Sequence, residues 1–206
     1  MDKVIINVGR QLCAGGLEIG RILADEFNAK LYDRELLNLA AKESGFSEEF
    51  FKKNDEKTGF FRSFLHMPFS SFANNTNFYQ SNFSQESLFK FQSDAIIKAA
   101  NEGSCVFVGR CADYVLRDFP NVVNVFVTAS LEDRARLFMK VKNVSYEEAL
   151  RRVEQIEERR ASYYTYYTGK RWGYAASYDL CVDSSILGIP ETAQYIAEFV
   201  RKKLKL

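Results

Sequence analysis

Short apolar runs alternate along the chain with longer segments whose apolar residues recur at helical spacing. Five such runs predict strands: Val4–Val8, a weaker run that ends at Asp33, Cys105–Gly109, Val122–Ala129 and Tyr178–Ser184. Runs such as Val106–Val108 show no polar alternation, which is typical of strands that helices cover on both faces. The alternation of strands and helices predicts a doubly wound α/β domain built on a parallel sheet.

The segments between these runs carry recognisable helix signals. Ile19, Leu23 and Phe27 form one apolar stripe over residues 15–27. The other signals are caps and helix starts: Asp33 before a helix that stops at Gly45, Ser130 with Asp133, Ser145 with Glu148 ahead of a long helix, and Pro190 in the first turn of the last helix. Helices are therefore expected after the first, second, fourth and fifth predicted strands.

A segment rich in phenylalanine, residues 46–91, interrupts this rhythm. Its phenylalanines gather between Phe60 and Phe91, separated by Ser and Asn, and such a stretch is too aromatic for a plain linker. It is either an insertion whose aromatics pack onto the core or a mobile cover that contacts a ligand or a second subunit. We expect it to lie beside the ligand-binding crevice and to help form a homodimer, because one insertion cannot readily bury so much apolar area. The single domain then has a core of residues 1–45 and 92–206.

Composition narrows the functional classes. A chain of 206 residues with 47% apolar and 27% charged residues suits one globular domain. The formal net charge of +1 argues against nucleic-acid binding by bulk charge, and no membrane-length apolar run or signal-peptide pattern is visible. Four cysteines without a CxxC pair and a single histidine offer no zinc site. We expect a cytoplasmic protein that binds neither membranes nor nucleic acid, and we predict no metal-ligating residues.

The loop after the first predicted strand is the first candidate for chemistry. The sequence VIINVGRQLCAGGLEIG indicates a strand, a glycine-containing loop and a helix start, an arrangement that aims backbone N–H groups at an anion. It departs from the phosphate-loop motif G-x-x-x-x-G-K-[ST], because Gly16 occupies the lysine position and Leu17 the hydroxyl position. We expect the main anion site at the N–H groups of Ala14 to Leu17. The alternative is a plain glycine turn before a helix.

Four stretches of the chain resemble the cytidylate kinase-like family of bacterial proteins, relatives of nucleoside monophosphate kinases. They are the loop Gly9–Gly20, YDRELL at Tyr32–Leu37, VGRCADYVL at Val108–Leu116, and RRASYYTYYTGKRWG at Arg159–Gly173 followed by YDLCVDSSILG. The resemblance implies the P-loop kinase fold: a five-stranded parallel sheet, a phosphate loop, a helical insertion over the acceptor, and a basic lid over the donor phosphates at about residues 157–175. It also implies phosphoryl transfer from ATP, with Mg²⁺, to a nucleoside monophosphate such as CMP or to another small acceptor.

Phosphoryl transfer needs positive charge around the transferring phosphate. Arg159 and Arg160 lie on the predicted long helix, and Lys170 and Arg171 lie in the loop after it. The resemblance assigns this segment to the lid, with Arg159 and Arg160 as catalytic cations and Lys170 and Arg171 on the donor phosphates. The alternative is a solvated helix face followed by a tyrosine-rich packing surface, with the tyrosines on the side of Arg160.

Arg110 ends the third predicted strand, where a side chain points into the ligand crevice of an α/β sheet. In the related kinases an arginine at a similar place holds the acceptor's phosphate, so we expect Arg110 to bind substrate and to act in catalysis. Asp113 is expected either to orient Arg110 or to contact the acceptor's amino group or sugar, and a purely structural Arg–Asp pair is the alternative. Asp33 and Arg34, at the end of the second strand, are expected on the acceptor side, although Asp33 also suits a helix cap.

The donor-binding candidates of the loop itself form one run around the glycines: Arg10, Cys13, Ala14, Gly15, Gly16 and Leu17. Loss of a phosphate-directed cation costs about 3–4 kcal/mol of transition-state stabilisation, and Arg10 is expected to substitute in part from the other side of the loop. Three hypotheses follow. The chain is an ATP-dependent kinase, a non-catalytic nucleotide- or phosphate-binding protein that kept the kinase fold, or an oligomerisation module built on the phenylalanine-rich segment.

Overall fold

The computed structural model describes residues 3–33 and 78–206. The chain forms two compact units, one made of Met1–Arg34 with Ile96–Leu206 and the other of Glu35–Ala95. In the second unit the described residues, 78–95, belong to the first part of helix α5 (Phe78–Glu102). The predicted helix after Asp33 and the part of the predicted insertion before Phe78 lie outside the described residues.

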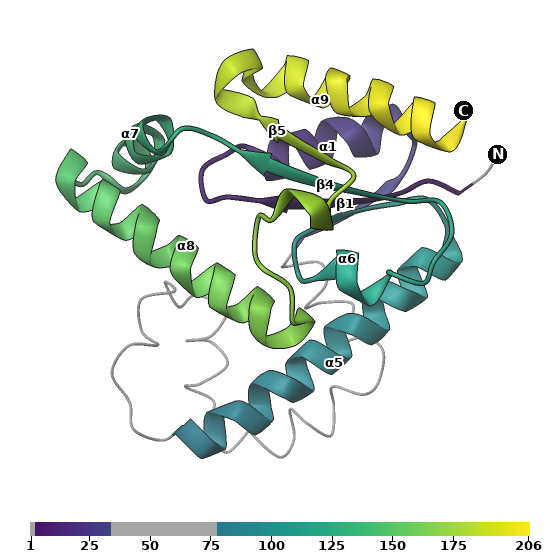
Figure 1. Cartoon of the computed structure of the whole chain (residues 1–206), viewed down its shortest axis with the longest axis horizontal. Helices are drawn as coiled ribbons and strands as arrows, with labels where there is room; N and C mark the ends of the chain where they lie inside the picture. Colours follow the sequence, from purple (N-terminus) through teal and green to yellow (C-terminus); the bar gives the residue numbers. More distant parts are fainter. Residues whose placement is uncertain (1–2, 34–77) are drawn as a thin grey trace. The chain divides into compact units, whose positions relative to one another are not determined.

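Five parallel strands of the described chain form one sheet in the first unit (Figure 1). They are β1 (Ile5–Arg10), β2 (Lys30–Tyr32), β3 (Cys105–Val108), β4 (Val122–Thr128) and β5 (Leu180–Asp183). The order across the sheet is β2-β3-β1-β4-β5, so β1 is central and pairs with β3 on one side and β4 on the other. The five predicted strands and the doubly wound parallel sheet are confirmed, with strand ends shifted by one or two residues.

Helices follow β1, β4 and β5 as the patterning predicts, whereas α5 and α6, on either side of β3, are not among the predicted helices. The described helices of the first unit are α1 (Gly16–Glu26), the C-terminal part of α5, the short α6 (Ala112–Val115), α7 (Leu131–Lys142), α8 (Tyr146–Thr168) and α9 (Ser184–Leu204). The N-cap bond of each predicted capping box is present: Ser130 Oγ accepts from the Asp133 N–H at 3.1 Å, and Ser145 Oγ accepts from the Glu148 N–H at 3.2 Å. These caps fix where α7 and α8 begin.

Helix α9 is broken at Gly188, whose φ of 75° and ψ of 167° are not helical. Pro190 lies in the first turn after this break, as predicted, because its missing N–H leaves no hydrogen bond unmade there. The sequence signals do not predict the short segment before the break, residues 184–187. That segment begins where the Asp183 side chain accepts the Ser185 N–H at 2.8 Å, and Ser184 Oγ ties it to the loop after β1 by donating to the Ala14 carbonyl at 2.9 Å.

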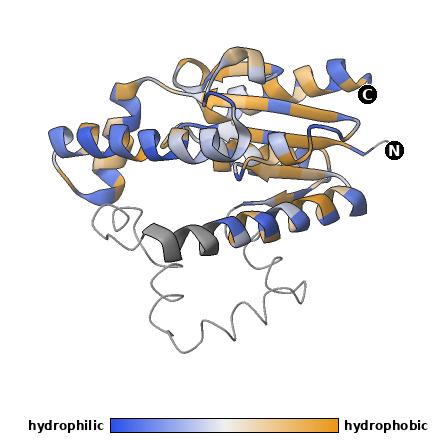
Figure 2. Cartoon of the chain, turned by 60° about the horizontal axis from the view of Figure 1, so that its bottom comes forward, coloured by the Kyte–Doolittle hydropathy of each residue, from blue (hydrophilic) through white to orange (hydrophobic). Residues whose placement is uncertain are grey.

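Helices α1 and α9 cover one face of the sheet, while α6 and residues 96–102 of α5 lie on the other (Figure 1). The strands are mostly apolar, and the helices carry more polar side chains (Figure 2). Ile19 and Leu23 of α1 are fully buried in the core, where each such side chain contributes about 1.5–3 kcal/mol. Gly20 allows this close approach, since a Cβ there would lie 2.7 Å from Val108 Cγ2. The core therefore holds the start of α1 at the carboxyl edge of the sheet.

A second, smaller core joins α7 to α8. Ala135 and Phe138 of α7 pack with Ala149 and Val153 of α8, and Leu12 from the loop after β1 packs against this cluster. The pairing fixes the course of α8, whose later turns reach the loop after β1.

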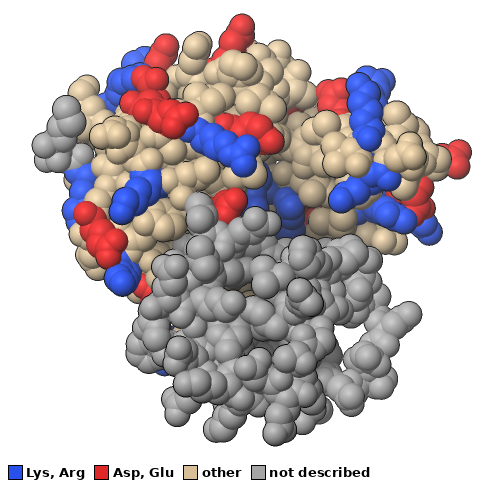
Figure 3. All heavy atoms as spheres, turned by 180° about the vertical axis from the view of Figure 1, so that it is seen from behind, with Lys and Arg blue, Asp and Glu red and all other residues tan. Residues whose placement is uncertain are grey.

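Acidic and basic side chains are interspersed over the face shown in Figure 3, which agrees with the near-neutral net charge. Among the described residues, no helix has the length and apolarity needed to cross a membrane.

Candidate active site

The loop after β1 presents unpaired backbone N–H groups at the carboxyl edge of the sheet. Residues 11–15 join β1 to α1, with Cys13 and Gly15 in left-handed conformations at φ 61° and φ 75°. The Ile19 N–H is the first of α1 to find a helical acceptor, the Gly15 carbonyl at 3.0 Å. Within the described residues the N–H groups of 15–18 have no acceptor, and the positive end of the helix dipole adds to them. The Ala14 N–H, by contrast, donates to the Gln11 carbonyl at 3.4 Å, so of the predicted group Ala14 to Leu17 only residues 15–17 have N–H groups without an acceptor among the described residues.

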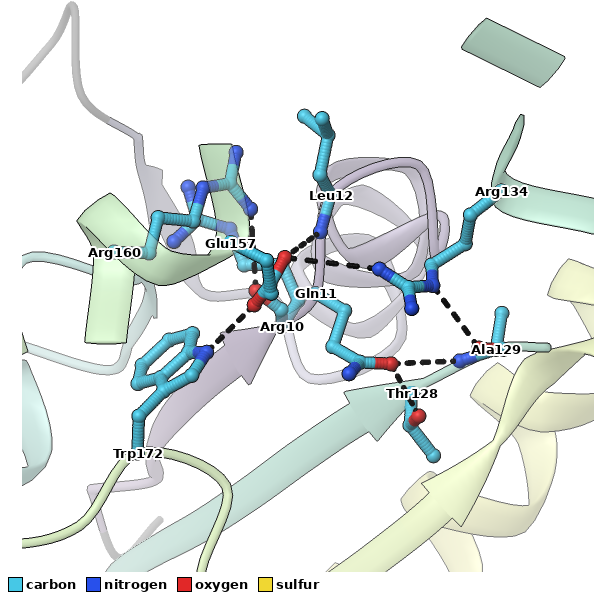
Figure 4. A network of polar contacts seen from close by, with 9 residues as sticks. All are labelled: Arg10, Gln11, Leu12, Thr128, Ala129, Arg134, Glu157, Arg160 and Trp172. Atoms are coloured by element: carbon cyan, nitrogen blue, oxygen red, sulfur yellow. Dashed lines mark hydrogen bonds and ion pairs between the residues drawn. The ribbon is translucent and has the colours of Figure 1, made fainter. Parts of the chain in front are cut away.

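Gln11 anchors this loop to the end of β4. Its backbone N–H donates to the Val127 carbonyl at 3.0 Å. Its side-chain Oε1 accepts from the Ala129 N–H at 3.4 Å and from the Thr128 hydroxyl (Figure 4). The hydrogen bond from Ser184, which directly follows β5, adds to these contacts with the end of β4. The loop after β1 is thus held in place by the ends of β4 and β5. The geometry of the N–H groups is therefore set before any ligand binds.

Arg10 explains why the loop lacks the lysine of the standard motif. Its aliphatic stem passes directly over Gly16, where a Cβ would lie 2.6 Å from both Cβ and Cγ of Arg10. Its guanidinium then packs on Gly109 at the end of β3, where a Cβ would lie 2.8 Å from Cζ. A side chain at residue 16 and the observed course of Arg10 are mutually exclusive. The departure at Gly16 and the arginine at position 10 thus belong to one arrangement.

Arg10, Arg110 and Arg160 form a cluster of cations at this edge, which we call the arginine cluster. Burial, followed by the charges of Arg160 and Arg110, lowers the pKa of Arg10 to about 9. Burial also lowers the pKa of Arg160, and the Arg110 charge adds to this effect. Arg160 Nη1 donates to the Arg10 carbonyl at 3.3 Å, whereas the side chains of Arg10 and Arg110 make no hydrogen bond or ion pair with the described residues. The arrangement has the charge of an anion site.

Glu157 of α8 lies beside Arg10 and Arg160 of this cluster (Figure 4). Its Oε2 accepts from the Leu12 N–H at 2.9 Å and lies 3.8 Å from Nη1 of buried Arg134. Its Oε1 accepts from the Trp172 indole N–H at 2.6 Å. The carboxylate raises the pKa values of Arg10 and Arg160 against the effect of burial. Among the described residues, Glu157 and, more weakly, Asp33 therefore compensate only part of the positive charge gathered here.

The chain after β3 is strained where it carries Arg110. Gly109, Arg110 and Cys111 follow one another in left-handed conformations, with φ of 79°, 59° and 56°. The two residues with side chains cost about 1–2 kcal/mol each, and such strain gathers at functional sites. Gly109 has positive φ and no room for a Cβ beneath Arg10. The turn thereby brings Arg110 toward Arg10, the neighbouring member of the arginine cluster.

Asp113 does not pair with Arg110 in the described structure, so the predicted structural Arg–Asp pair is absent. Its Oδ2 instead accepts from the Tyr164 hydroxyl of α8 at 2.6 Å. Burial raises the pKa of Asp113, while the Tyr164 hydrogen bond and the charge of Lys170 act against this. Burial raises the pKa of the Tyr178 hydroxyl, and the nearby negative charge of Asp113 raises the pKa of Tyr178 further. Asp113 therefore links the turn that carries Arg110 to α8.

The predicted lid combines charge and packing. Arg159 and Arg160 lie on α8 and are half-buried, and residues 169–174 form the loop that carries Lys170 and the exposed Arg171. The tyrosine stripe packs as the alternative interpretation expects, because Tyr164 is buried with its ring centroid 5.1 Å from that of Trp172. The two interpretations are compatible: one side of α8 packs while Arg160 faces the loop after β1.

Of the remaining predicted site residues, Asp33 and Cys13 are described by the structure and Arg34 is not. Half-buried Asp33 follows β2 and its charge acts on Arg10, whereas Arg34 lies outside the described residues. Cys13 is half-buried in the loop, where burial raises the pKa of its thiol. Sequence analysis missed Gln11, Arg134, Glu157 and Trp172. The only local signal for Glu157 is its position three residues before Arg160 on a predicted helix.

The sheet order, the glycine loop and the arginine cluster define an α/β protein of the P-loop kinase-like class. The chain belongs to the cytidylate kinase-like family, whose model matches residues 5–186. By family and by fold it is therefore a kinase-like protein, as the sequence resemblance implies.

Solved structures agree on the fold. An uncharacterized protein from Eubacterium ventriosum is 23% identical, with 96% of this chain and 98% of that chain covered and a TM-score of 0.72. A shikimate kinase from Bacteroides thetaiotaomicron is 13% identical, with 98% and 99% covered and a TM-score of 0.54. TT1252 from Thermus thermophilus is 16% identical, with 99% of both chains covered and a TM-score of 0.55. A comparison with curated protein sequences found no match. At these identities the structural likeness establishes the fold alone.

Proposed function

We propose that the protein is an ATP-dependent kinase that transfers the γ-phosphoryl group to a small acceptor, with a nucleoside monophosphate such as CMP as the first acceptor class to test. The observation that carries this proposal is the arginine cluster beside the free N–H groups of residues 15–18. Guanidinium groups that the described acids compensate only in part favour a bound anion, because each buried charge is costly until it is paired. Phosphate offers the charge and the bidentate geometry that guanidinium recognises.

Arg10 takes the part of the phosphate-loop lysine in this proposal. In the standard motif the lysine reaches the β- and γ-phosphates. Arg10 approaches from the end of β1 over the space that Gly16 leaves free, and Arg159 and Arg160 add charge from the lid helix. These cations would stabilise the charge on the equatorial oxygens of the transferring phosphoryl group, which is the main catalytic requirement of the reaction. Lys170 and Arg171 are assigned to the donor's outer phosphates.

The acceptor side is assigned to the carboxyl ends of β2 and β3. Arg110 would hold the acceptor's phosphate, with Asp33 and Arg34 lining the same side. Because a nucleoside monophosphate already carries an ionised phosphate at neutral pH, its attacking oxygen needs no general base from this chain. Asp113 is bonded to Tyr164 and is assigned to placing the turn that carries Arg110.

The short segment at the start of α9 is a candidate platform for the adenine base. Ile186 and Leu187 are 79% and 40% exposed, and Ser184 ties their segment to the loop after β1. Apolar side chains beside a phosphate site suit the flat face of a base.

Mg²⁺ fits this site only through the nucleotide. Position 17 carries the metal-binding hydroxyl in the standard loop, but here it is Leu17, and the described residues contain no group of three or more His, Cys, Asp or Glu side chains that could hold a metal ion. Mg²⁺ commonly keeps its waters and binds substrate phosphates, so ATP itself would carry it. No step of the proposed reaction is assigned to the metal.

A second candidate function, nucleotide or phosphate binding without catalysis, is favoured by the combination of Gly16 and Leu17 in the loop. A coupled ADP-release assay with nucleoside monophosphates, sugars and small acids, shikimate included, separates the two. ADP release that depends on one acceptor supports the kinase. A thermal shift with ATP and no ADP release with any acceptor would favour the binding protein, since a ligand at 100 times its Kd stabilises by about 2.7 kcal/mol.

We also propose, from the sequence, that the protein is a cytoplasmic homodimer assembled through the phenylalanine-rich segment. Light scattering tests the assembly, and a monomer of 23.7 kDa at micromolar concentration would contradict it. If a dimer forms, Phe72→Asp and Phe78→Asp are expected to separate it while the sheet stays folded.

A further inference from the structure

Glu157 stands at the meeting point of four segments that the phosphoryl-transfer proposal treats separately (Figure 4). It projects from α8, bonds the loop after β1 at Leu12, lies beside Arg134 of α7, and accepts from Trp172 of the loop after α8. The position of the Trp172 ring is also fixed by packing. The ring lies edge-on to that of Phe126 of β4, with 5.0 Å between the two ring centroids. A single carboxylate therefore connects the candidate donor loop to the candidate lid.

The Glu157 carboxylate also balances positive charge on neighbouring arginines. Arg134 is 7% exposed, and its Nη1 is buried without a hydrogen bond, so Glu157 at 3.8 Å is its counter-charge. Among the charges acting on Arg10, Glu157 is the strongest that opposes burial. Removing it would leave Arg134 uncompensated and would increase repulsion within the arginine cluster. The contact at Leu12 lies outside residues 15–18, so Glu157 supports the loop and leaves the free N–H groups open.

We propose that Glu157 is a positioning residue of the donor site, which holds the loop after β1 in its anion-binding form and fastens the loop after α8 to it through Trp172. The ligand in this inference rests on the proposed function, but the fastening of the two loops does not. The sequence patterns did not single out Glu157. In this proposal Glu157 acts through the loop after β1 and does not touch the phosphate.

The test uses Trp172, which is the only tryptophan of the chain, as a reporter. The variant is Glu157→Gln, which keeps the size of the side chain and removes its charge. The matched control is Glu154→Gln, one turn earlier on α8, where the side chain is exposed and has no hydrogen bond in the described structure. Emission spectra and acrylamide quenching are recorded on the ligand-free proteins, and Kd values are then measured with the fluorescent analogue mant-ATP.

In Glu157→Gln the Trp172 emission is expected to shift to the red and to become more accessible to acrylamide, because the indole N–H loses its charged acceptor. Its Kd for mant-ATP is expected to rise about tenfold, because displacement of the loop outweighs the gain from removing one negative charge beside the anion site, while Glu154→Gln behaves as the wild type. If Glu157→Gln does not fold, Trp172→Phe removes the indole donor along with part of the ring that packs on Phe126, and it is expected to weaken mant-ATP by a smaller factor in a protein that still unfolds cooperatively.

Each outcome decides the inference. An unchanged Trp172 spectrum and quenching in folded Glu157→Gln would refute the fastening, whether or not the wild type binds mant-ATP. Altered quenching with wild-type affinity for mant-ATP would show that the donor site does not depend on Glu157, and would also overturn the proposal. A wild type that fails to bind mant-ATP counts against the proposed function, and the quenching result then decides the inference alone. Where Trp172→Phe is the variant tested, wild-type affinity overturns the proposal.

Discussion

Replacing Arg10 by methionine is expected to stabilise the ligand-free protein and to abolish its binding of phosphate groups. Methionine is unbranched and fills the space of the arginine stem over Gly16, but it carries no charge into the arginine cluster. Stability and function therefore respond in opposite directions to the same change. A residue kept only for packing would show no such opposition.

The magnitude follows from the pKa of Arg10, which burial and neighbouring arginines lower from 12.5 to about 9. At about 1.36 kcal/mol per pKa unit, holding the guanidinium charged at neutral pH costs at most about 5 kcal/mol. The side chain keeps some exposure, and replacing a buried charge by an apolar residue typically gains about 1–4 kcal/mol. We therefore expect Arg10→Met to raise the free energy of unfolding by about 1–3 kcal/mol, which is about 2–10 °C in Tm for a chain of this size.

The pH dependence has a definite sign. Because the pKa of Arg10 is lower in the folded state, the folded wild type loses this proton first, and its free energy of unfolding gains as pH rises above about 9. Arg10→Met lacks this gain, so its advantage over the wild type is largest at neutral pH and shrinks toward pH 10. Comparing the two proteins cancels the contributions of Cys105 and Cys111, whose pKa values burial raises to about 11 and about 12.

The assay is urea unfolding at pH 7.5 and pH 10, with and without saturating ATP. The wild type should gain stability from ATP and Arg10→Met should not. Destabilisation of Arg10→Met by more than about 1 kcal/mol at neutral pH, together with an unchanged response to ATP, would refute the assignment of Arg10 as a buried, only partly compensated cation of the phosphate site.

Three further substitutions test the edge of the sheet. Arg110→Ala is expected to weaken the acceptor at least about tenfold and ATP much less, by titration of each ligand; equal losses would contradict its acceptor role. Gly109→Ala is expected to lower stability by about 2–4 kcal/mol in urea unfolding, because its Cβ would meet the Arg10 guanidinium at a positive φ, and a change below about 0.5 kcal/mol would show that Arg10 takes another course. Tyr164→Phe is expected to cost about 1–3 kcal/mol, since Asp113 loses its hydrogen bond while burial persists; wild-type stability would mean that Asp113 is solvated or protonated.

The parts of the fold that sequence patterning predicted are those governed by local chemistry. The capping boxes at Ser130 and Ser145 involve residues three apart, and the buried strands are recognisable because every position is apolar. The placement of Arg10 and Arg110 at one edge also follows from sequence, because the carboxyl ends of parallel strands lie together. These predictions needed the strand boundaries to be right only within a residue or two.

The internal geometry of the site depends on contacts between distant parts of the chain. Leu12 and Glu157, 145 residues apart, meet only because α7 and α8 pack as a pair. The fit of Arg10 over Gly16 and Gly109 is a matter of tenths of an ångström between three segments. Asp113 bonds to Tyr164 rather than Arg110, because the left-handed turn at residues 109–111 sends the two side chains to different neighbours. No periodicity or spacing in the sequence carries that information.

The central claim is that Arg10 and Arg160 bind the phosphates of ATP and that the protein transfers one of them to an acceptor. Phosphorus-31 NMR of the wild type with ATP, Mg²⁺ and a panel of acceptors headed by CMP tests it most directly, because donor, product and phosphorylated acceptor give separate signals. We predict ADP together with one new phosphorylated acceptor for the wild type, and neither for Arg10→Met or Arg160→Met. Phosphorylated acceptor formed at the wild-type rate by both variants, or no ADP from the wild type with any acceptor, would contradict the claim.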